Sequence, residues 1–586
     1  MSGTRIIIDK DVEIPLRDGT ITRADVYRLQ DAPPGPVILV RTPYSKEDLV
    51  HIIAELFMDP FEMVRQGYVW LVQDVRGRFA SEGDFEPFRN ELQDGYDSVE
   101  WAAAQSWSNG KVGMAGSSYV GMTQWLAATQ NPPHLRCIVP TMTASNYHEG
   151  VSYRSGALDF GTSMFWHLAV IGQHFLTREI DKGEASPEVL EKLTSSLFNI
   201  EEVMKSRPLA AVSPLDEAVH WYKTWLDHPS YDEYWKAIAP KEYYPSMNDI
   251  AVFNIGAWFD IFLGGTIENY TGMARKQGAK GSAGNRLLVG PWSHAEFSGR
   301  FAEMDFGLTA SAYAANLGVK IKRFFDYWLK DEQNGIDSEP PVEVFVMGEN
   351  VWKTAESYPL QETEWTKFYF HSGGSANTLK GDGALDTSAP ETEPEDVYLF
   401  DPRNPVPTVG GNTLLLGYNI NYNVGPKDQR EIEGRSDVLC YSSEVLSGPL
   451  EIIGPVKSVL YASSSAKDTD WTVKLVDVHP DGRAFYVMEG ILRARYHRSL
   501  EQAELLEPGK VYPFEIDLWS TAHVFKAGHK VRVEISSSNF PRYDVNTNTG
   551  GNFAEDRYED MVHAVNTIYH TEEYPSHIVL PVIPRS

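Results

Sequence analysis

A serine between two glycines is the first residue of this chain that could do chemistry. Ser118 lies two residues after Gly116 and three residues before Gly121. A short strand-like segment precedes it, and apolar residues at helical spacing follow it. A serine at a strand tip needs a strained backbone, which small neighbours make room for. The arrangement predicts a reactive hydroxyl, although a short motif of this kind also fits a glycine-rich turn with an exposed serine.

Two later residues could activate that hydroxyl. A serine attacks a carbonyl group only when a base removes its proton, and a carboxylate orients that base. Asp260 lies beyond a strand expected at Ala251–Ile255, and His294 lies beyond one expected at Arg286–Val289. In a parallel sheet both positions fall at the edge where the serine stands. Together the residues predict a triad of Ser118, His294 and Asp260, whereas either of the last two alone would more often be a loop or surface residue.

The first part of the chain has the elements that such a triad needs. A β-hairpin is expected from Ile6 to Arg28, and the continuous apolar runs Val37–Val40 and Tyr68–Val72 are typical of strands buried on both faces. Helical spacing extends from Leu49 to Gln66 between these strands, and another strand is expected at Leu135–Pro140. The alternation predicts βαβ units and a parallel sheet. A serine at a strand-to-helix turn of such a sheet is typical of an α/β-hydrolase core.

The rest of the chain changes character twice. From about Tyr147 to Pro240 helical patterns dominate, which predicts a helical cap inserted into the α/β core. The core then resumes and includes a long amphipathic helix expected from Ala312 to Lys330. Beyond Pro340 short strand runs separated by turns predict an all-β sandwich. We therefore expect a first core part at 1–146, a cap at 147–240, a second core part at 241–355 and a jelly-roll β-sandwich at 356–586.

The sequence also predicts a surface loop and five individual strands in the β domain. The stretch from Ser372 to Glu395 is rich in small and acidic residues and is expected to form a surface loop. The expected strands are Trp365–Phe370, Leu450–Ile453, Val459–Ala462, Trp471–Val478 and Val531–Ser536.

Composition limits the function further. The chain has 586 residues, 42% of them hydrophobic and 23% charged, which is typical of a globular protein of two to four domains. A net charge of −29 argues against nucleic acids and anionic membranes as partners. Cys137 and Cys440 are the two cysteines and lie far apart, so no disulfide framework is expected. Early charges and the lack of long apolar runs predict neither a signal peptide nor a membrane span, and hence a cytoplasmic protein.

Several separated motifs together resemble the cocaine esterase family. That family is grouped with Xaa-Pro dipeptidyl-peptidases and with α-amino-acid ester and cephalosporin acylases. The resemblance extends over essentially the whole chain and implies an α/β-hydrolase with a helical insertion and a C-terminal jelly roll, for which Asp470–Leu475 is similar. The other motifs that carry it are Arg41–Tyr44, Asp74–Gly77, Gly116–Trp125, Trp258–Asp260 and Gly290–His294.

The resemblance also implies an oxyanion hole. Its two donors would be the hydroxyl of Tyr44 and the backbone N–H of Tyr119, the residue after the nucleophile. A phenol can serve as a donor because it remains protonated at neutral pH.

The substrate can be predicted only in outline. Trp166 and Phe262 resemble positions where family members present aromatic rings to the acyl group, although core packing explains them equally well. Val151 stands where some relatives carry an aromatic residue. The apolar residues Ile261–Leu263 follow Asp260, where amino-acid ester hydrolases of the family place carboxylates, and this argues against an α-amino substrate.

These observations predict a serine hydrolase that cleaves a small-molecule ester with an aromatic or neutral acyl group. The alternatives are an amide-cleaving relative, namely a β-lactam or cephalosporin acylase, an α-amino-acid ester hydrolase or an Xaa-Pro dipeptidyl-peptidase, and a non-catalytic binding protein. No cofactor or metal is expected, since the sequence has no HxxxH, HExxH or glycine-rich phosphate loop. The oligomeric state is left open, a homo-oligomer included.

Overall fold

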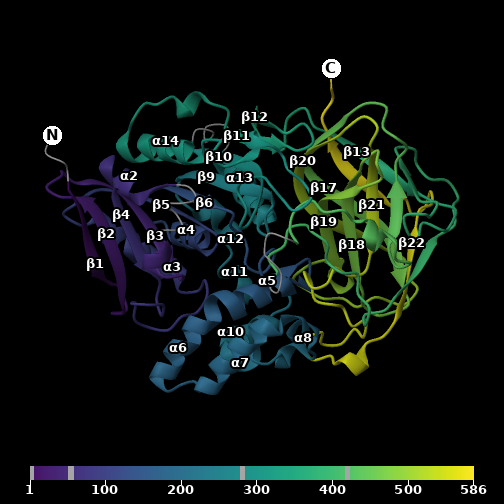
Figure 1. Cartoon of the computed structure of the whole chain (residues 1–586), viewed down its shortest axis with the longest axis horizontal. Helices are drawn as coiled ribbons and strands as arrows, with labels where there is room; N and C mark the ends of the chain where they lie inside the picture. Colours follow the sequence, from purple (N-terminus) through teal and green to yellow (C-terminus); the bar gives the residue numbers. More distant parts are fainter. Residues whose placement is uncertain (1–4, 50–57, 278–283, 416–422, 586) are drawn as a thin grey trace.

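The computed structural model describes residues 5–49, 58–277, 284–415 and 423–585. Its first large sheet has the strand order β1-β2-β4-β3-β5-β6-β9-β10-β11-β12 (Figure 1). The strands from β4 to β11 in this order are parallel, and antiparallel strands lie at both ends. The strands are β1 (Ile6–Pro15), β2 (Ile21–Leu29), β3 (Gly35–Thr42), β4 (Val69–Asp74), β5 (Ser108–Ser117), β6 (Leu135–Thr141), β9 (Ala251–Phe259), β10 (Asn285–Ser293), β11 (Val342–Val346) and β12 (Val351–Ala355).

Helices cover both faces of this sheet because its central strands are apolar on both sides. In β3, Ile38 and Val40 pack against α2 and α14, while Val37 and Leu39 face α3 and α4. This is the alternation that a strand imposes on successive side chains. The helices are α2 (Pro60–Arg65), α3 (Glu91–Ala103), α4 (Tyr119–Thr129), α13 (Leu263–Gln277) and α14 (Leu317–Lys330).

A helical segment is inserted between β6 and β9, and it lies below the sheet in the view of Figure 1. It begins with a short hairpin of β7 (Tyr153–Arg154) and β8 (Ala157–Leu158). Its helix α7 starts at Pro187, because the fixed backbone of proline suits the first position of a helix. The helices are α5 (Phe160–Met164), the π-helical segment η1 (Phe165–Ile171), α6 (Gly172–Lys182), α7 (Pro187–Phe198), α8 (Ile200–Lys205), α9 (Leu215–Ala218), α10 (His220–Asp227), α11 (Glu233–Lys236) and α12 (Pro240–Tyr243).

A β-sandwich follows the first sheet and lies on the right in Figure 1. It encloses an apolar core of its own, which includes Trp471, Phe514 and Ile535. Backbone hydrogen bonds join it to the first sheet, from Met347 N to the oxygen of Ala522 and from Val524 N to the oxygen of Met347, both 2.9 Å long. Its strands are β13 (Glu364–His371), β14 (Ala384–Asp386), β15 (Asp396–Phe400), β16 (Leu439–Ser442), β17 (Leu450–Ser464), β18 (Asp470–Val478), β19 (Ala484–Arg493), β20 (Tyr512–Phe525), β21 (Lys530–Ser536), β22 (Ala564–Tyr569) and β23 (His577–Val582).

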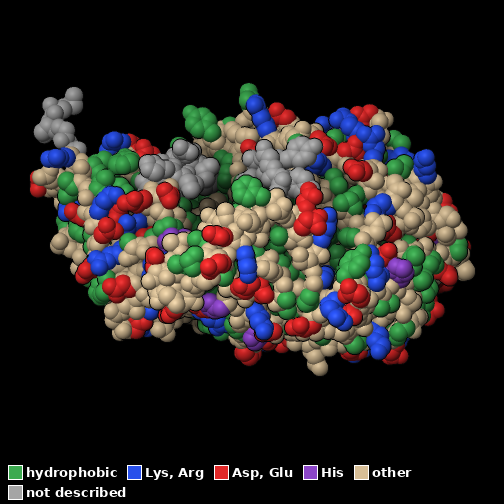
Figure 2. Space-filling model, turned by 60° about the horizontal axis from the view of Figure 1, so that its bottom comes forward, with side chains coloured by type: hydrophobic (Ala, Val, Ile, Leu, Met, Phe, Trp, Pro, Cys, Tyr) green, Lys and Arg blue, Asp and Glu red, His purple; other side chains and the backbone are tan. Residues whose placement is uncertain are grey.

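The chain thus has the expected fold, an α/β-hydrolase core with a helical insert and a C-terminal β-sandwich domain. The division at residues 146, 240 and 355 stays a prediction. Among the described residues, no helix combines the length and the apolar character that crossing a membrane requires. On the face in Figure 2, acidic and basic side chains are interspersed, so the negative charge is not gathered into one patch there.

Some element boundaries differ from the prediction. Helix α14 begins at Leu317 rather than Ala312, because Asn316 has a left-handed backbone with φ of 54°. The two strands expected between Leu450 and Ala462 form the single strand β17, which carries a bulge after Pro455. Of the helix expected from Leu49 to Gln66, residues 50–57 lie outside the described residues, and α2 accounts for the end.

Candidate active site

Ser118 stands at a sharp turn between β5 and α4. Its backbone has φ of 60° and ψ of −127°, a strained conformation for a residue with a side chain. A Cβ atom on Gly116 would lie 2.2 Å from Cγ1 of Val120, and one on Gly121 would lie 2.7 Å from Cβ of Thr143. Gly116 therefore lets β5 and α4 approach each other at the turn, and Gly121 lets α4 approach the segment that follows β6.

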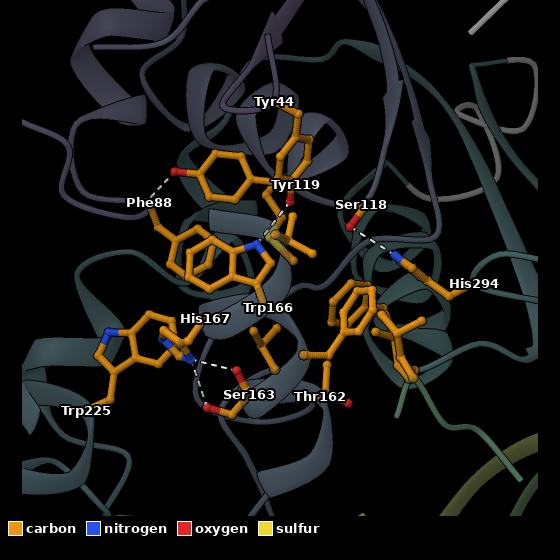
Figure 3. Close-up of a pocket in the computed structure, with 17 residues that line it drawn as sticks. Tyr44, Phe88, Ser118, Tyr119, Thr162, Ser163, Trp166, His167, Trp225 and His294 are labelled. Carbon is orange, nitrogen blue, oxygen red and sulfur yellow. Dashed lines mark hydrogen bonds between the residues drawn. The ribbon is translucent and has the colours of Figure 1, made fainter. Parts of the chain in front are cut away.

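The structure brings Ser118, His294 and Asp260 together. Nε2 of His294 lies 3.0 Å from Oγ of Ser118 (Figure 3). On the other side of the ring, Nδ1 of His294 lies 2.6 Å from Oδ1 of Asp260. Strands β9 and β10 run further than expected, so Asp260 and His294 directly follow their last residues. The side chain of Asp260 is fully buried, whereas that of His294 is 14% exposed. One hydroxyl, one imidazole and one carboxylate therefore form a continuous hydrogen-bonded chain.

Hydrogen bonds from residues of the β-sandwich domain hold the loop that carries Asp260. Nδ2 of Asn412 donates to the backbone oxygens of Trp258 and Asp260, at 3.0 and 2.8 Å. The hydroxyl of Tyr486 in β19 donates to Oδ1 of Asn412 at 2.9 Å. The carboxylate of Asp260 also accepts a hydrogen bond from the N–H of Phe262 at 3.0 Å. Sequence reasoning missed Asn412 because a lone asparagine in a loop carries no local signal.

Tyr44 lies beside the serine in a loop that a buried arginine supports. Nε of Arg78 donates to the oxygen of Pro43 at 2.9 Å, and Nε1 of Trp166 donates to the Tyr44 hydroxyl at 3.1 Å. Burial raises the pKa of Tyr44 to about 12, although hydrogen bonds with Trp166 and Ser118 oppose the rise. The phenol accordingly keeps its proton at neutral pH. Trp166 donates to the phenol oxygen, so it does not use the O–H group of Tyr44 as a donor.

Tyr119 is the first residue of α4, so its N–H points out of the helix end without an intrahelical acceptor. Its ring stacks on that of Phe88, with centroids 5.0 Å apart. Its hydroxyl lies 3.2 Å from Oε1 of Glu91, which forms a buried ion pair of 2.8 Å with Arg41. Arg41 therefore supports Tyr119 indirectly, through its ion pair with Glu91.

A cavity of about 230 Å³ opens over Ser118 and His294. Trp166 and Phe262 both line it, and Phe262 meets the ring of His294 edge-on, with centroids 5.2 Å apart. Trp166 projects from the π-helical segment η1 and stacks on Trp225. No Asp, Glu, Lys or Arg is among the described residues that line the cavity. These are Tyr44, Phe88, Ser118, Tyr119, Met122, Val151, Thr162, Ser163, Phe165, Trp166, His167, Val170, Trp225, Ile261, Phe262, His294 and Leu414.

The arrangement could perform acyl transfer. It offers a hydroxyl within reach of an imidazole, a carboxylate on the far side of that imidazole, and two donors beside the hydroxyl. Within the described part of the chain, a grouping of side chains with metal-ligand geometry occurs elsewhere, at Asp477, His479 and His529.

The chain is similar to known hydrolases along nearly its whole length. The family model of the X-Pro dipeptidyl-peptidase (S15 family) matches residues 18–296, and that of the X-Pro dipeptidyl-peptidase C-terminal non-catalytic domain matches residues 334–579. Cocaine esterase from Rhodococcus sp. is 40% identical over 580 residues, which cover 99% of each protein.

Solved structures agree in fold. A selenomethionine-labelled α-amino acid ester hydrolase is 26% identical, with a TM-score of 0.82 over 99% of this chain and 97% of the other. An aminopeptidase from a marine sediment Thaumarchaeota archaeon is 24% identical and superposes with a TM-score of 0.81, over 99% of this chain and 96% of its own, which shows the shared fold. The chain therefore belongs to the cocaine esterase family of serine hydrolases, within the X-Pro dipeptidyl-peptidase (S15) family.

Proposed function

We propose that this protein is a serine carboxylic-ester hydrolase for small esters with a neutral, preferably aromatic, acyl group. The observation that carries the proposal is the 3.0 Å contact between Oγ of Ser118 and Nε2 of His294 at the floor of an uncharged, aromatic cavity. Membership of the serine hydrolase family supports it.

In the first step Ser118 attacks the ester carbonyl carbon while its proton passes to Nε2 of His294. The carbonyl oxygen becomes an oxyanion, to which the Tyr44 hydroxyl and the Tyr119 N–H donate hydrogen bonds. The tetrahedral intermediate then collapses. The bond to the alcohol breaks, and His294 protonates the leaving alkoxide as the acyl-enzyme forms.

In the second step water replaces the alcohol. His294 takes a proton from the water, the resulting hydroxide attacks the acyl carbon, and Ser118 leaves with the returned proton. Asp260 accepts the Nδ1–H of His294 throughout, which selects the tautomer with a basic Nε2 and stabilises the imidazolium. No further group is required to balance this reaction.

The lining of the cavity supports the acyl group that we propose. The indole of Trp166 and the ring of Phe262 offer flat apolar surfaces near Ser118. Val151 adds a small apolar side chain to the lining of the same cavity. The name of the Rhodococcus relative, cocaine esterase, agrees with an ester substrate.

Amide cleavage is the second candidate, and family membership supports it, because the S15 family model carries a peptidase name. The same triad would serve both reactions. The cavity disfavours it, because a substrate with an α-ammonium group needs a carboxylate to replace its hydration, and none of the described residues that line the cavity carries one. A binding protein without activity would not need the contact between Ser118 and His294.

A substrate panel tests the proposal. Hydrolysis of p-nitrophenyl benzoate, p-nitrophenyl butyrate and alanyl-prolyl-p-nitroanilide should be compared for the wild type and Ser118→Ala. We expect the benzoate to have the highest kcat/KM, the anilide to be inert and the variant to lose the activity. Preferential cleavage of the anilide would favour the peptidase, and equal ester hydrolysis by Ser118→Ala would overturn the proposal.

A further inference from the structure

Three histidines converge on one buried carboxylate in the β-sandwich, apart from the catalytic cavity. Asp477 lies near the end of β18, and His479 lies in the turn after it. His523 projects from β20, and His529 immediately precedes β21. Asp477 is 3% exposed, and His523 and His529 are each 8% exposed. Three segments of the domain thus place imidazoles around a single carboxylate.

The contacts are close enough for shared coordination. Oδ1 of Asp477 lies 2.8 Å from Nδ1 of His529, and Oδ2 lies 3.6 Å from Nε2 of His479. One ligand atom from each of these three residues falls within 4.8 Å of the other two. In a tetrahedral zinc site with bonds of about 2.1 Å, ligand atoms are separated by about 3.4 Å. Small side-chain rotations would therefore close this group around an ion.

We propose that Asp477, His479 and His529 bind one divalent transition-metal ion, with zinc as the expected ion. Imidazole nitrogen and carboxylate oxygen suit zinc, whereas calcium and magnesium prefer oxygen ligands alone. His523 is the positioning partner, because its Nε2 lies 3.1 Å from Oδ2 of Asp477 and can hold the carboxylate in place.

Backbone hydrogen bonds fix the ligands before an ion arrives. His479 lies in a turn closed by bonds from its N–H to the oxygen of Arg483 and from Gly482 N to its own oxygen, at 2.8 and 2.9 Å. The N–H of His529 bonds to the oxygen of Lys526 at 3.0 Å. Asp477 pairs with Val531 across the sheet. The site is thus preorganised on two adjacent strand connections.

The surroundings fit an ion rather than an organic molecule. The cluster lines a cavity of about 80 Å³, which has room for a metal ion and a few waters. The side chain of His479 is 23% exposed, so an ion can reach the cluster from the solvent. Phe259, Phe306 and Met347 of the hydrolase core also line this cavity. A bound ion would accordingly stiffen the junction between the β-sandwich and the core.

Metal binding by the full-length protein tests the proposal. After treatment with a chelator and its removal, Zn²⁺ should be titrated by calorimetry, and bound metal counted by mass spectrometry. We expect one Zn²⁺ per chain, a higher Tm with Zn²⁺, and at least tenfold weaker binding for His479→Gln and for His529→Gln. His371→Gln is the matched control, since that histidine also contacts a carboxylate in the same domain, Glu393 at 2.7 Å, and it should bind Zn²⁺ like the wild type.

Cobalt provides a readout that does not depend on the variants. Wild-type protein loaded with Co²⁺ should show the intense visible absorption of a tetrahedral or five-coordinate site. A wild type that binds no Zn²⁺, or binding that is equal in His479→Gln, His529→Gln and His371→Gln, would overturn the proposal. Co²⁺ that keeps the weak spectrum of the hexaaqua ion would do the same.

Discussion

The indole N–H of Trp166 donates a hydrogen bond of 3.1 Å to the hydroxyl oxygen of Tyr44, and both side chains line the cavity over Ser118 (Figure 3). Trp166 belongs to the inserted helices, whereas Tyr44 follows β3 of the core. This contact ties the cap to the proposed oxyanion donor. Because Trp166 uses the acceptor of the phenol, the phenolic proton remains available to a developing oxyanion.

Replacement of Tyr44 by phenylalanine removes one oxyanion donor and keeps the ring. We expect kcat for p-nitrophenyl benzoate to fall by about 10²- to 10³-fold with little change in KM, because the donor acts on charge that develops in the transition state. Steady-state kinetics check this. A variant within threefold of the wild-type kcat would remove Tyr44 from the mechanism.

Trp166→Phe keeps an aromatic wall and deletes the N–H that orients Tyr44. The loss of one hydrogen bond of ordinary strength corresponds to roughly a 2- to 10-fold lower kcat. Trp225→Phe is the matched control, since Trp225 lines the same cavity and stacks on Trp166. We expect the control to retain more kcat than Trp166→Phe, and the reverse order would contradict the orienting role.

The raised pKa of Tyr44 predicts how activity depends on alkaline pH. Burial raises the pKa to about 12, so the phenol keeps its proton, and its donor function, as the pH increases through 10. Consequently, kcat measured from pH 8 to 10 should not decline through ionisation of Tyr44. An alkaline decline near pH 10 that is present in the wild type and absent in Tyr44→Phe would contradict this expectation.

Asn412 is a positioning residue for the proposed catalytic acid. Asn412→Ala removes both bonds to the loop of Asp260, and we expect a roughly tenfold lower kcat with little change in KM. Tyr486→Phe loses only the bond to Asn412 and should have a smaller effect. Thermal unfolding measured alongside separates positioning from general destabilisation. Equal kcat values for Asn412→Ala and the wild type would show that the Asp260 loop keeps its position without Asn412.

The fold was predictable where local patterns decide the structure. Continuous apolar runs mark strands such as β3 and β4, which are buried on both faces. The glycines around Ser118 mark the turn because no larger residue fits there. The family resemblance is confirmed by the similarity to cocaine esterase. The roles of the site residues stay proposals, although the structure brings Ser118, Asp260 and His294 into contact.

Features that depend on distant contacts were not predictable. Asn412 donates to the backbone of Asp260 although the two residues are 152 positions apart in the sequence. The support of Pro43 by Arg78 likewise depends on a single side-chain hydrogen bond. The two proposed ligand histidines, His479 and His529, come from separate strand connections, so their spacing in the sequence matches no metal motif. The start of α14 depends on the backbone of Asn316, which the apolar pattern does not reveal.

The central claim is that the Ser118 hydroxyl is activated by His294, and covalent labelling tests it most directly. The wild type, Ser118→Ala and His294→Ala should be treated with a fluorophosphonate, and the adducts located by peptide mass spectrometry. We predict a single adduct on Ser118 in the wild type, none on Ser118→Ala, and labelling of His294→Ala that is slower by at least about 10³-fold. An adduct on another serine, or equal labelling rates for the wild type and His294→Ala, would contradict the claim.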